Sequence, residues 1–78
     1  METRTPDDYM RFIEELGANI SLLRRAKGLS QEELSELIGI SRVHMGYIEQ
    51  ARRAPSLEIL YDIARALGVG VGELFPAR

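Results

Sequence analysis

The side chains best suited to binding another molecule are concentrated in one segment, from Ser41 to Arg53. It contains three arginines, the one histidine of the chain and a tyrosine, all of which can donate hydrogen bonds. An arginine can donate two hydrogen bonds to guanine O6 and N7, and a valine such as Val43 can pack against a thymine methyl group. This segment therefore has the chemistry to contact phosphates and base edges.

The sequence gives no comparable support for a catalytic or metal site. The absence of cysteine excludes disulfides, thiolate metal sites and cysteine nucleophiles. His44 has no second histidine or cysteine with which to share a metal ion. Serine and aspartate occur, but without the spacing or glycine-rich turn of a nucleophile site. We therefore expect no enzymatic activity, no cofactor, no metal and no small-molecule ligand.

Length and charge limit the class of protein. The 78 residues are enough for one small domain, and the net charge is −2. Residues 1–15 have two basic and five acidic side chains (−3), residues 16–55 six and four (+2), and residues 56–78 two and three (−1). The positive charge is therefore central. No apolar run approaches the roughly 18 residues of a membrane span, and no signal peptide is recognisable, so we expect a soluble, cytoplasmic protein with no membrane partner.

Two short helices must position the binding segment. Ser30 and Glu33 have the spacing of a capping box that begins a helix over 31–38, and Gly39 is placed to end it. Ser41 can then cap another helix over about 42–50, which is the third along the chain, the helix over 31–38 being the second. A helix pair joined by a short glycine turn is a helix-turn-helix, which can place its second helix in a DNA major groove, but similar pairs also occur in helical bundles that bind no DNA.

The remaining elements are also helical. Pro6, Asp7 and Asp8 predict the start of a first helix with an apolar stripe that continues to Leu23, and Gly17 lies inside this stripe. Either the helix tolerates Gly17, or the N-terminal part is a separable extension. A fourth helix follows Ser56, and a short fifth is expected around 71–75. The predicted fold is all-α, a compact five-helix domain over 16–78 with an N-terminal helical extension over 1–15.

Apolar periodicity predicts the core of this domain. Five residues are expected to fix the angle between the second and third helices: Leu34, Leu37, Ile40, Met45 and Ile48. The apolar face expected for the fourth helix consists of Leu57, Leu60, Ile63, Ala64 and Leu67. On the third helix, Arg42, Val43, His44 and Tyr47 fall on the face away from Met45 and Ile48, which leaves them available for contacts outside the domain.

From Ile20 to Phe75 the chain resembles the DNA-binding domain of lambda-repressor-like, Cro/repressor-type regulators, the xenobiotic-response-element family. The shared features are LRRAKGLSQEELSELIGIS, then IEQ, then RRAPSLEILYDIARALGV. The resemblance implies a homodimer whose third helix recognises a pseudo-palindromic operator. Among stand-alone members, the compact size is most similar to controller proteins of restriction-modification systems, with small phage repressors and antitoxins as competing readings.

The resemblance also implies a set of DNA-contacting residues: Gln31, Ser41, Arg42, Val43, His44, Tyr47, Arg52 and Arg53. Among these, Arg42 is expected to read a base and Gln31 to donate to a phosphate. The two loop arginines are expected to hold phosphates, and Pro55 stiffens the loop that presents them. For most of these residues the competing interpretation is an ordinary solvent-exposed side chain. Arg42 could instead bind a phosphate, and Tyr47 could only flank the core.

Two further roles follow from the resemblance. Arg24 and Glu49 match an arginine and a glutamate that form a partly buried ion pair in the family, so removing either is expected to destabilise the fold. The apolar residues Val69, Val71, Leu74 and Phe75 lie where the family forms its two-fold interface.

Three positions depart from the family pattern. Ala51 replaces a favoured glycine after the third helix, so the turn must either avoid positive φ or accept strain of about 1 kcal/mol. Ser35 replaces an alanine at a tight helix contact, and its hydroxyl needs a partner. Ala54 replaces a frequent polar residue, which removes one potential DNA contact.

The expected function is that of a sequence-specific transcriptional regulator of prokaryotic or phage origin, associated with the nucleoid when bound. Binding over its own promoter would repress it. Glu32, Glu33 and Glu36 could instead contact RNA polymerase and activate transcription, although solvated helix charges are the favoured explanation of these residues. The alternative function is a protein-interaction module, such as an antitoxin-type partner binder, that uses the same helical bundle without DNA.

Overall fold

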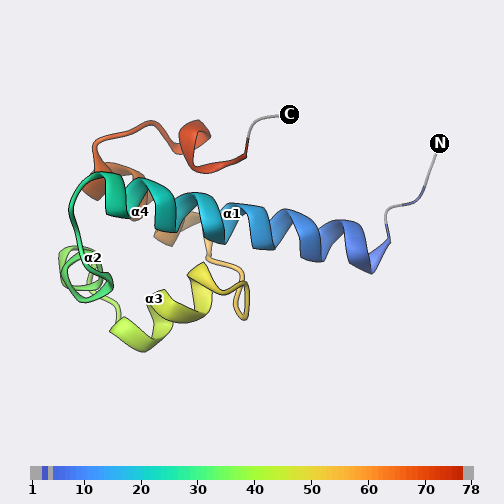
Figure 1. Cartoon of the computed structure of the whole chain (residues 1–78), viewed down its shortest axis with the longest axis horizontal. Helices are drawn as coiled ribbons and strands as arrows, with labels where there is room; N and C mark the ends of the chain where they lie inside the picture. The colour runs from blue at the N-terminus through green and yellow to red at the C-terminus, as the bar shows by residue number, and fades with distance from the viewer. Residues whose placement is uncertain (1–2, 4, 77–78) are drawn as a thin grey trace.

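The structure is a computed structural model that describes Thr3 and residues 5–76. Four α-helices follow one another along the chain: α1 (Pro6–Ala26), α2 (Gln31–Ile38), α3 (Arg42–Glu49) and α4 (Leu57–Leu67) (Figure 1). A four-residue 3-10 helix, η1 (Val71–Leu74), completes them. The described residues contain no strand, so the all-α prediction is confirmed. The expected fifth helix differs in kind, since it is a single 3-10 turn.

Helix α1 is unbroken over 21 residues. It begins at a capping box, in which the Thr5 hydroxyl accepts from the Asp8 N–H at 3.2 Å and the Asp8 carboxylate accepts from the Thr5 N–H at 3.1 Å. Its first turns project beyond the other helices, and the molecule measures 42 × 23 × 20 Å. The expected N-terminal extension is thus continuous with α1 from Pro6 onward, while Met1, Glu2 and Arg4 lie outside the described residues.

Gly17 is buried where α1 meets α3. A Cβ atom added to it would lie 2.5 Å from the carbonyl oxygen of Ile48 and 2.7 Å from that of Glu49. Both distances are far below van der Waals contact with backbone that cannot swing aside. The glycine therefore permits the close approach of the two helices, which explains its presence inside a helix that its propensity disfavours.

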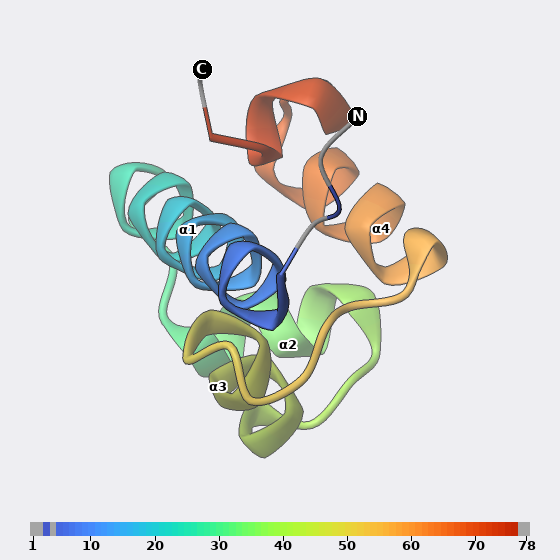
Figure 2. The ribbon, with the colours of Figure 1, turned by 90° about the vertical axis from the view of Figure 1, so that its right-hand side faces the viewer.

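The turn between α2 and α3 has the predicted local structure. Ser30 and Glu33 exchange hydrogen bonds of 3.0 and 2.8 Å in the capping box of α2. Gly39 ends α2 with a left-handed φ of 79°, and the Ser41 hydroxyl caps α3 by accepting from the His44 N–H at 3.0 Å. Figure 2 shows α2 and α3 together on one side of α1. The helix-turn-helix is therefore present and rigidly terminated at both ends of its turn.

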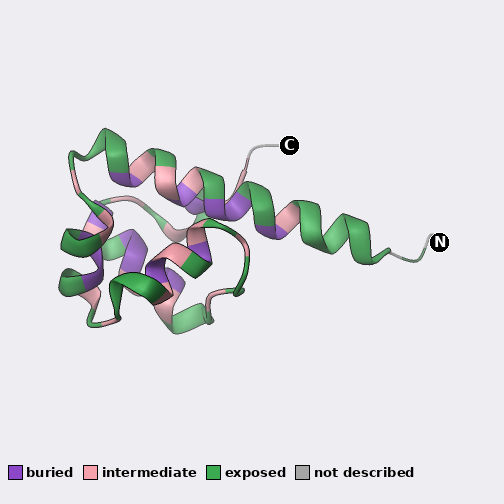
Figure 3. Cartoon of the chain, turned by 60° about the horizontal axis from the view of Figure 1, so that its bottom comes forward, coloured by how far each residue is buried: buried purple, intermediate pink, exposed green. Residues whose placement is uncertain are grey.

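Buried residues of every element contribute to one core, and Figure 3 marks the buried residues in purple on the ribbon. Its largest fully buried apolar side chains are Ile20, Leu34, Met45, Ile48, Ile63, Leu67 and Leu74. Ile40 packs against this core as predicted. The prediction for Leu37 is wrong, since it is 63% exposed. The buried stripe of α2 includes Leu34 and Ser35, and Leu37 lies on the side of Leu34 away from Ser35.

Leu57 belongs by its spacing to the expected apolar face of α4, but it is 78% exposed. It is the first residue of α4 and lies one turn before Leu60, where burial begins. Periodicity identifies the face of a helix, but it does not show how far along the helix its neighbours extend.

The structure shows how the chain accommodates Ser35 and Ala51, two of the positions that depart from the family pattern. The Ser35 hydroxyl donates to the Gln31 carbonyl at 2.6 Å, so the buried side chain has the partner that it requires. Ala51 adopts a φ of 62°, in the left-handed region that favours glycine. The turn after α3 therefore accepts backbone strain and does not avoid it.

The C-terminal segment is attached to α1. The side-chain amide of Asn19 donates to the carbonyl oxygens of Glu73 and Leu74 at 2.9 and 2.8 Å. The ring of Phe75 stacks on that of Phe12 with centroids 5.8 Å apart. These contacts hold η1 against the first helix, and Leu74 is fully buried in the core as a result.

Candidate nucleic-acid interface

The outer face of α3 presents the residues expected to contact DNA. Arg42, Val43 and Tyr47 are exposed and His44 is half-buried, whereas Met45 and Ile48 face the core. Ser41 is exposed but its hydroxyl is engaged as the cap of α3. Because the buried face fixes the rotation of α3 about its axis, the opposite face has a defined set of side chains.

The loop after α3 is anchored to the end of that helix. The backbone N–H groups of Arg52 and Arg53 both donate to the carbonyl oxygen of Tyr47, at 2.8 and 3.2 Å. The guanidinium carbon of Arg52 also lies 5.8 Å from the centroid of the Tyr47 ring, within range of a cation–π interaction. Both arginines are exposed. The loop therefore presents its positive charge beside the outer face of α3.

Arg24 and Glu49 lie in contact beneath this face. Arg24 Nε donates to Glu49 Oε2 at 2.7 Å and Arg24 Nη2 donates to Oε1 at 3.0 Å, so the pair is bidentate. Arg24 Nη1 also donates to the Leu29 carbonyl at 2.7 Å. Burial favours the neutral form of Glu49, but hydrogen bonds from Arg24 and Gln31 outweigh burial and lower the pKa of its carboxyl. The pair thus joins α1 to the last residue of α3.

Gln31, the first residue of α2, belongs to the same network. Its side-chain Nε2 donates to Glu49 Oε1 at 2.9 Å. The sequence placed Gln31 and Glu49 in separate roles, because residues 18 positions apart give no local signal of contact. The contact between Tyr47 and Arg52 was likewise not anticipated. In the first pair, Glu49 holds the side chain of Gln31, which belongs to the expected DNA-contacting set. In the second pair, Tyr47 and Arg52 both belong to that set and contact each other.

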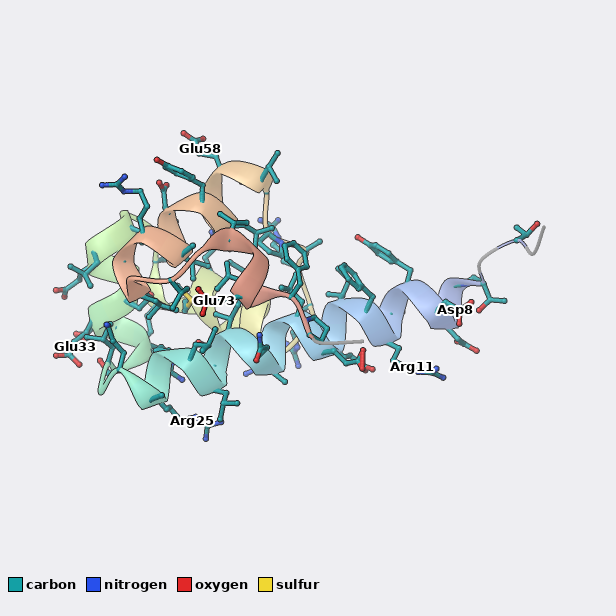
Figure 4. All side chains as sticks on the ribbon, turned by 90° about the horizontal axis from the view of Figure 1, so that it is seen from above. Asp8, Arg11, Arg25, Glu33, Glu58 and Glu73 are labelled. Carbon is teal, nitrogen blue, oxygen red and sulfur yellow. The ribbon has the colours of Figure 1, made fainter. Side chains whose placement is uncertain are left out.

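Charge is distributed unevenly around the interface. The exposed arginines of α3 and the following loop contrast with the acidic outer side of α2, where Glu32, Glu33 and Glu36 are exposed. In Figure 4, Glu33 projects from α2, while Asp8 and Arg11 project from the first turns of α1. A polyanion would therefore be attracted to α3 and the adjoining loop more than to the acidic outer side of α2.

The residues expected at a dimer interface differ in their exposure. Val69, Val71 and Phe75 are half-buried and pack against the core, so each keeps some surface for a partner. Leu74 has none, because it is fully buried within one protomer. The apolar surface available for self-association is thus narrower than the sequence indicated.

The comparisons with known proteins agree with this geometry. A protein-family model described as helix-turn-helix matches residues 20–74. An HTH-type transcriptional regulator of Sinorhizobium fredii, y4dJ, is 44% identical over 59 residues, which cover 76% of this chain and 77% of that protein. The control protein C.SmaI of Serratia marcescens is 35% identical over 66 residues, which cover 85% and 79%.

A solved structure gives the same result in three dimensions. The restriction-modification controller protein C.AhdI from Aeromonas hydrophila superposes with a TM-score of 0.79 at 40% sequence identity. The match covers 81% of this chain and 96% of that one. The residues matched by the family model, 20–74, include both helices of the helix-turn-helix. No helix in the described part of the chain is both long and apolar enough to cross a membrane.

Proposed function

This chain belongs to the helix-turn-helix family of DNA-binding transcriptional regulators, and we propose that it binds a pseudo-palindromic operator as a homodimer and regulates its own promoter. The observation that carries the proposal is the face of α3, where Arg42, Val43 and Tyr47 are exposed beside two loop arginines. These side chains supply donors for guanine and phosphate and an apolar contact for thymine. No acidic side chain belongs to this set.

A dimer supplies what one protomer lacks. A single small domain makes few phosphate contacts and binds DNA weakly, with a strong dependence on salt. Two copies related by two-fold symmetry would place their α3 helices in successive major grooves about 34 Å apart. The half-buried apolar residues Val69, Val71 and Phe75 are the proposed contact between the copies. Operator symmetry then follows from protein symmetry.

The similarity to C.SmaI and C.AhdI favours a controller-like role within this function. Occupancy of a promoter would exclude RNA polymerase and repress transcription. At a suitably spaced site, the exposed glutamates of α2, including Glu32 and Glu36, would face the polymerase and recruit it. Which outcome occurs depends on the position of the operator, so one protein can perform both.

The test is a selection of bound duplexes from a random DNA library, followed by titration of the selected duplex with wild type and Arg42→Ala at fixed salt. We expect a two-fold-symmetric motif, with the variant losing about 1–3 kcal/mol and accepting any base at one position per half-site. Arg65→Ala is the matched control, because it removes an exposed arginine of α4 outside the proposed interface. Absence of any enriched motif would refute operator recognition and favour a protein-binding module.

A further inference from the structure

The Glu49 carboxylate joins the ion pair of the core to the proposed DNA surface. Its Oε1 accepts from Arg24 Nη2 at 3.0 Å and from Gln31 Nε2 at 2.9 Å, while Oε2 accepts from Arg24 Nε at 2.7 Å. Glu49 is the last residue of α3 and Gln31 the first of α2. Three helices therefore meet at one carboxylate, and only Gln31 among the three residues also belongs to the expected DNA-contacting set.

The negative charge of Glu49 determines the orientation of the side-chain amide of Gln31. A glutamine amide has a carbonyl oxygen at one position and an NH₂ group at the other, and a free side chain can present either. An ionised carboxylate only accepts hydrogen bonds, so it selects the orientation with Nε2 toward itself. Gln31 Oε1 is consequently directed elsewhere, and it lies 3.9 Å from the position that a Cβ on Gly46 would occupy. The amide thus lies along α3 between Glu49 and Gly46.

This orientation leaves one N–H group of Gln31 available. Nε2 carries two hydrogens, and Glu49 accepts one of them. None of the described residues accepts the other. A DNA phosphate, like a carboxylate, only accepts hydrogen bonds, so the opposite amide orientation would place an oxygen against it.

We infer that Glu49, itself held by Arg24, is a positioning residue that orients the Gln31 amide so that its second N–H donates to a DNA phosphate. The inference rests on the proposed DNA-binding function and adds a role for the buried ion pair in it. The ion pair would then contribute to affinity as well as to folding, because breaking it frees Gln31 to rotate and to present the wrong group. If the contact between Gln31 and Glu49 were purely structural, it would influence stability alone.

A double-mutant cycle on operator affinity distinguishes these roles. The four proteins are wild type, Gln31→Ala, Glu49→Gln and the double variant, each titrated against the selected duplex at a temperature where circular dichroism shows it fully folded. We expect Gln31→Ala to weaken binding about tenfold per half-site, the effect of losing one hydrogen bond to a charged group. Glu49→Gln should weaken binding several-fold in wild type but not in the Gln31→Ala background, where nothing remains to be positioned.

Salt dependence supplies a second readout. Gln31 is neutral and releases no counterion, so Gln31→Ala should leave the slope of log K against log salt unchanged. If Glu49→Gln fails to fold, Glu49→Asp takes its place, since it keeps the charge but withdraws the carboxylate from Gln31. An equal loss of operator affinity from the Glu49 substitution in both backgrounds would overturn the positioning role.

The proposed function is tested separately. It would survive that result if wild type selects a symmetric motif and Arg42→Ala weakens binding to it, and it would fail if no motif is selected.

Discussion

Gly17 of α1 lies so close to Ile48 of α3 that a Cβ atom on the glycine would come within 2.5 Å of the Ile48 carbonyl oxygen. The backbone of α1 is therefore in direct contact with α3 near its C-terminal end. Arg24 binds Glu49, the next residue of α3, from a position two turns further along α1. One small residue and one ion pair together set the distance between these helices, and through it the placement of the outer face of α3.

Substituting Gly17 by alanine should destabilise the fold. Alanine is the better helix former by about 1 kcal/mol, but its methyl group would overlap two backbone carbonyls that cannot move without separating α1 from α3. We expect a net loss of about 1–3 kcal/mol in the free energy of unfolding, measured by urea denaturation.

Gly46→Ala is the matched control for this prediction. Gly46 also lies within a helix, but a Cβ there would meet only Gln31 Oε1, at the ordinary contact distance of 3.9 Å. Its free energy of unfolding should rise by about 1 kcal/mol. Equal effects from both substitutions would show that helix propensity, and not the contact with α3, determines the role of Gly17.

The ion pair predicts a specific loss of stability in acid. Hydrogen bonds from Arg24 and Gln31 lower the pKa of Glu49 below its ordinary value of 4.5, despite the opposing effect of burial. A carboxyl whose pKa is lowered by folding contributes stability that is fully present above its unfolded pKa and is lost as pH falls through its folded pKa. Wild type should therefore lose stability below about pH 4.5.

Glu49→Gln should remove this part of the acid response. We expect it to cost about 3 kcal/mol at pH 7, because the Arg24 charge is left buried without its partner. Its stability should then fall less steeply than that of wild type as pH is lowered. The capping carboxylates Asp8 and Glu33, whose pKa values are also lowered, are unchanged in both proteins and cancel in the comparison. Parallel pH profiles would assign the acid response to these other carboxylates.

The helix-turn-helix could be predicted from the sequence because its signals are local. Ser30, Glu33, Gly39 and Ser41 each act on backbone groups within a few residues, and the structure shows each of them at its predicted turn or cap. The contact between Gln31 and Glu49 could not be predicted in this way, because it depends on how α2 meets α3. Proximity across helices is a property of packing, which spacing along the chain does not encode.

Gly17 illustrates the same limit. A glycine in an apolar stripe indicates either a tolerated cost or a break, and the sequence offered no means to choose. The structure supplies a third explanation, since α1 remains intact and the glycine admits a neighbouring backbone. The departure at Ala51, in contrast, was recognisable from the family resemblance, which favours glycine after the third helix, and the structure shows that the turn adopts positive φ.

Ala51→Gly should stabilise the protein. Ala51 has a φ of 62°, a conformation that costs a residue with a Cβ about 1–2 kcal/mol and a glycine nothing. The greater freedom of glycine in the unfolded chain offsets part of this, so we expect a gain of about 0.5–1 kcal/mol in thermal or urea unfolding. Ala54→Gly in the same loop is the control, since Ala54 has no positive φ and should only lose stability. If both variants were less stable than wild type, the backbone strain at Ala51 would be contradicted.

Val71→Asp should shift the protein from dimer to monomer. Val71 opens η1 and is half-buried, so a charge there would be desolvated at the proposed two-fold contact. We expect monomers by sedimentation equilibrium at concentrations where wild type is dimeric, together with weaker operator binding. Leu57→Asp is the control, because Leu57 is more exposed yet lies outside the proposed contact. Helical content measured by circular dichroism must match wild type in both. Dimers of Val71→Asp would exclude this segment as the interface.

Arg52→Ala should reduce both operator affinity and its dependence on salt. If Arg52 neutralises one phosphate, its removal lowers the slope of log K against log salt by about 1 per protomer, unlike loss of a neutral donor. The ring of Tyr47 lies under this guanidinium, so Tyr47→Phe should keep the slope of wild type, whereas Tyr47→Ala should weaken binding by freeing Arg52. The slopes follow from titrations at several salt concentrations. An unchanged slope for Arg52→Ala would place that arginine away from the DNA backbone, despite its attachment to the end of α3.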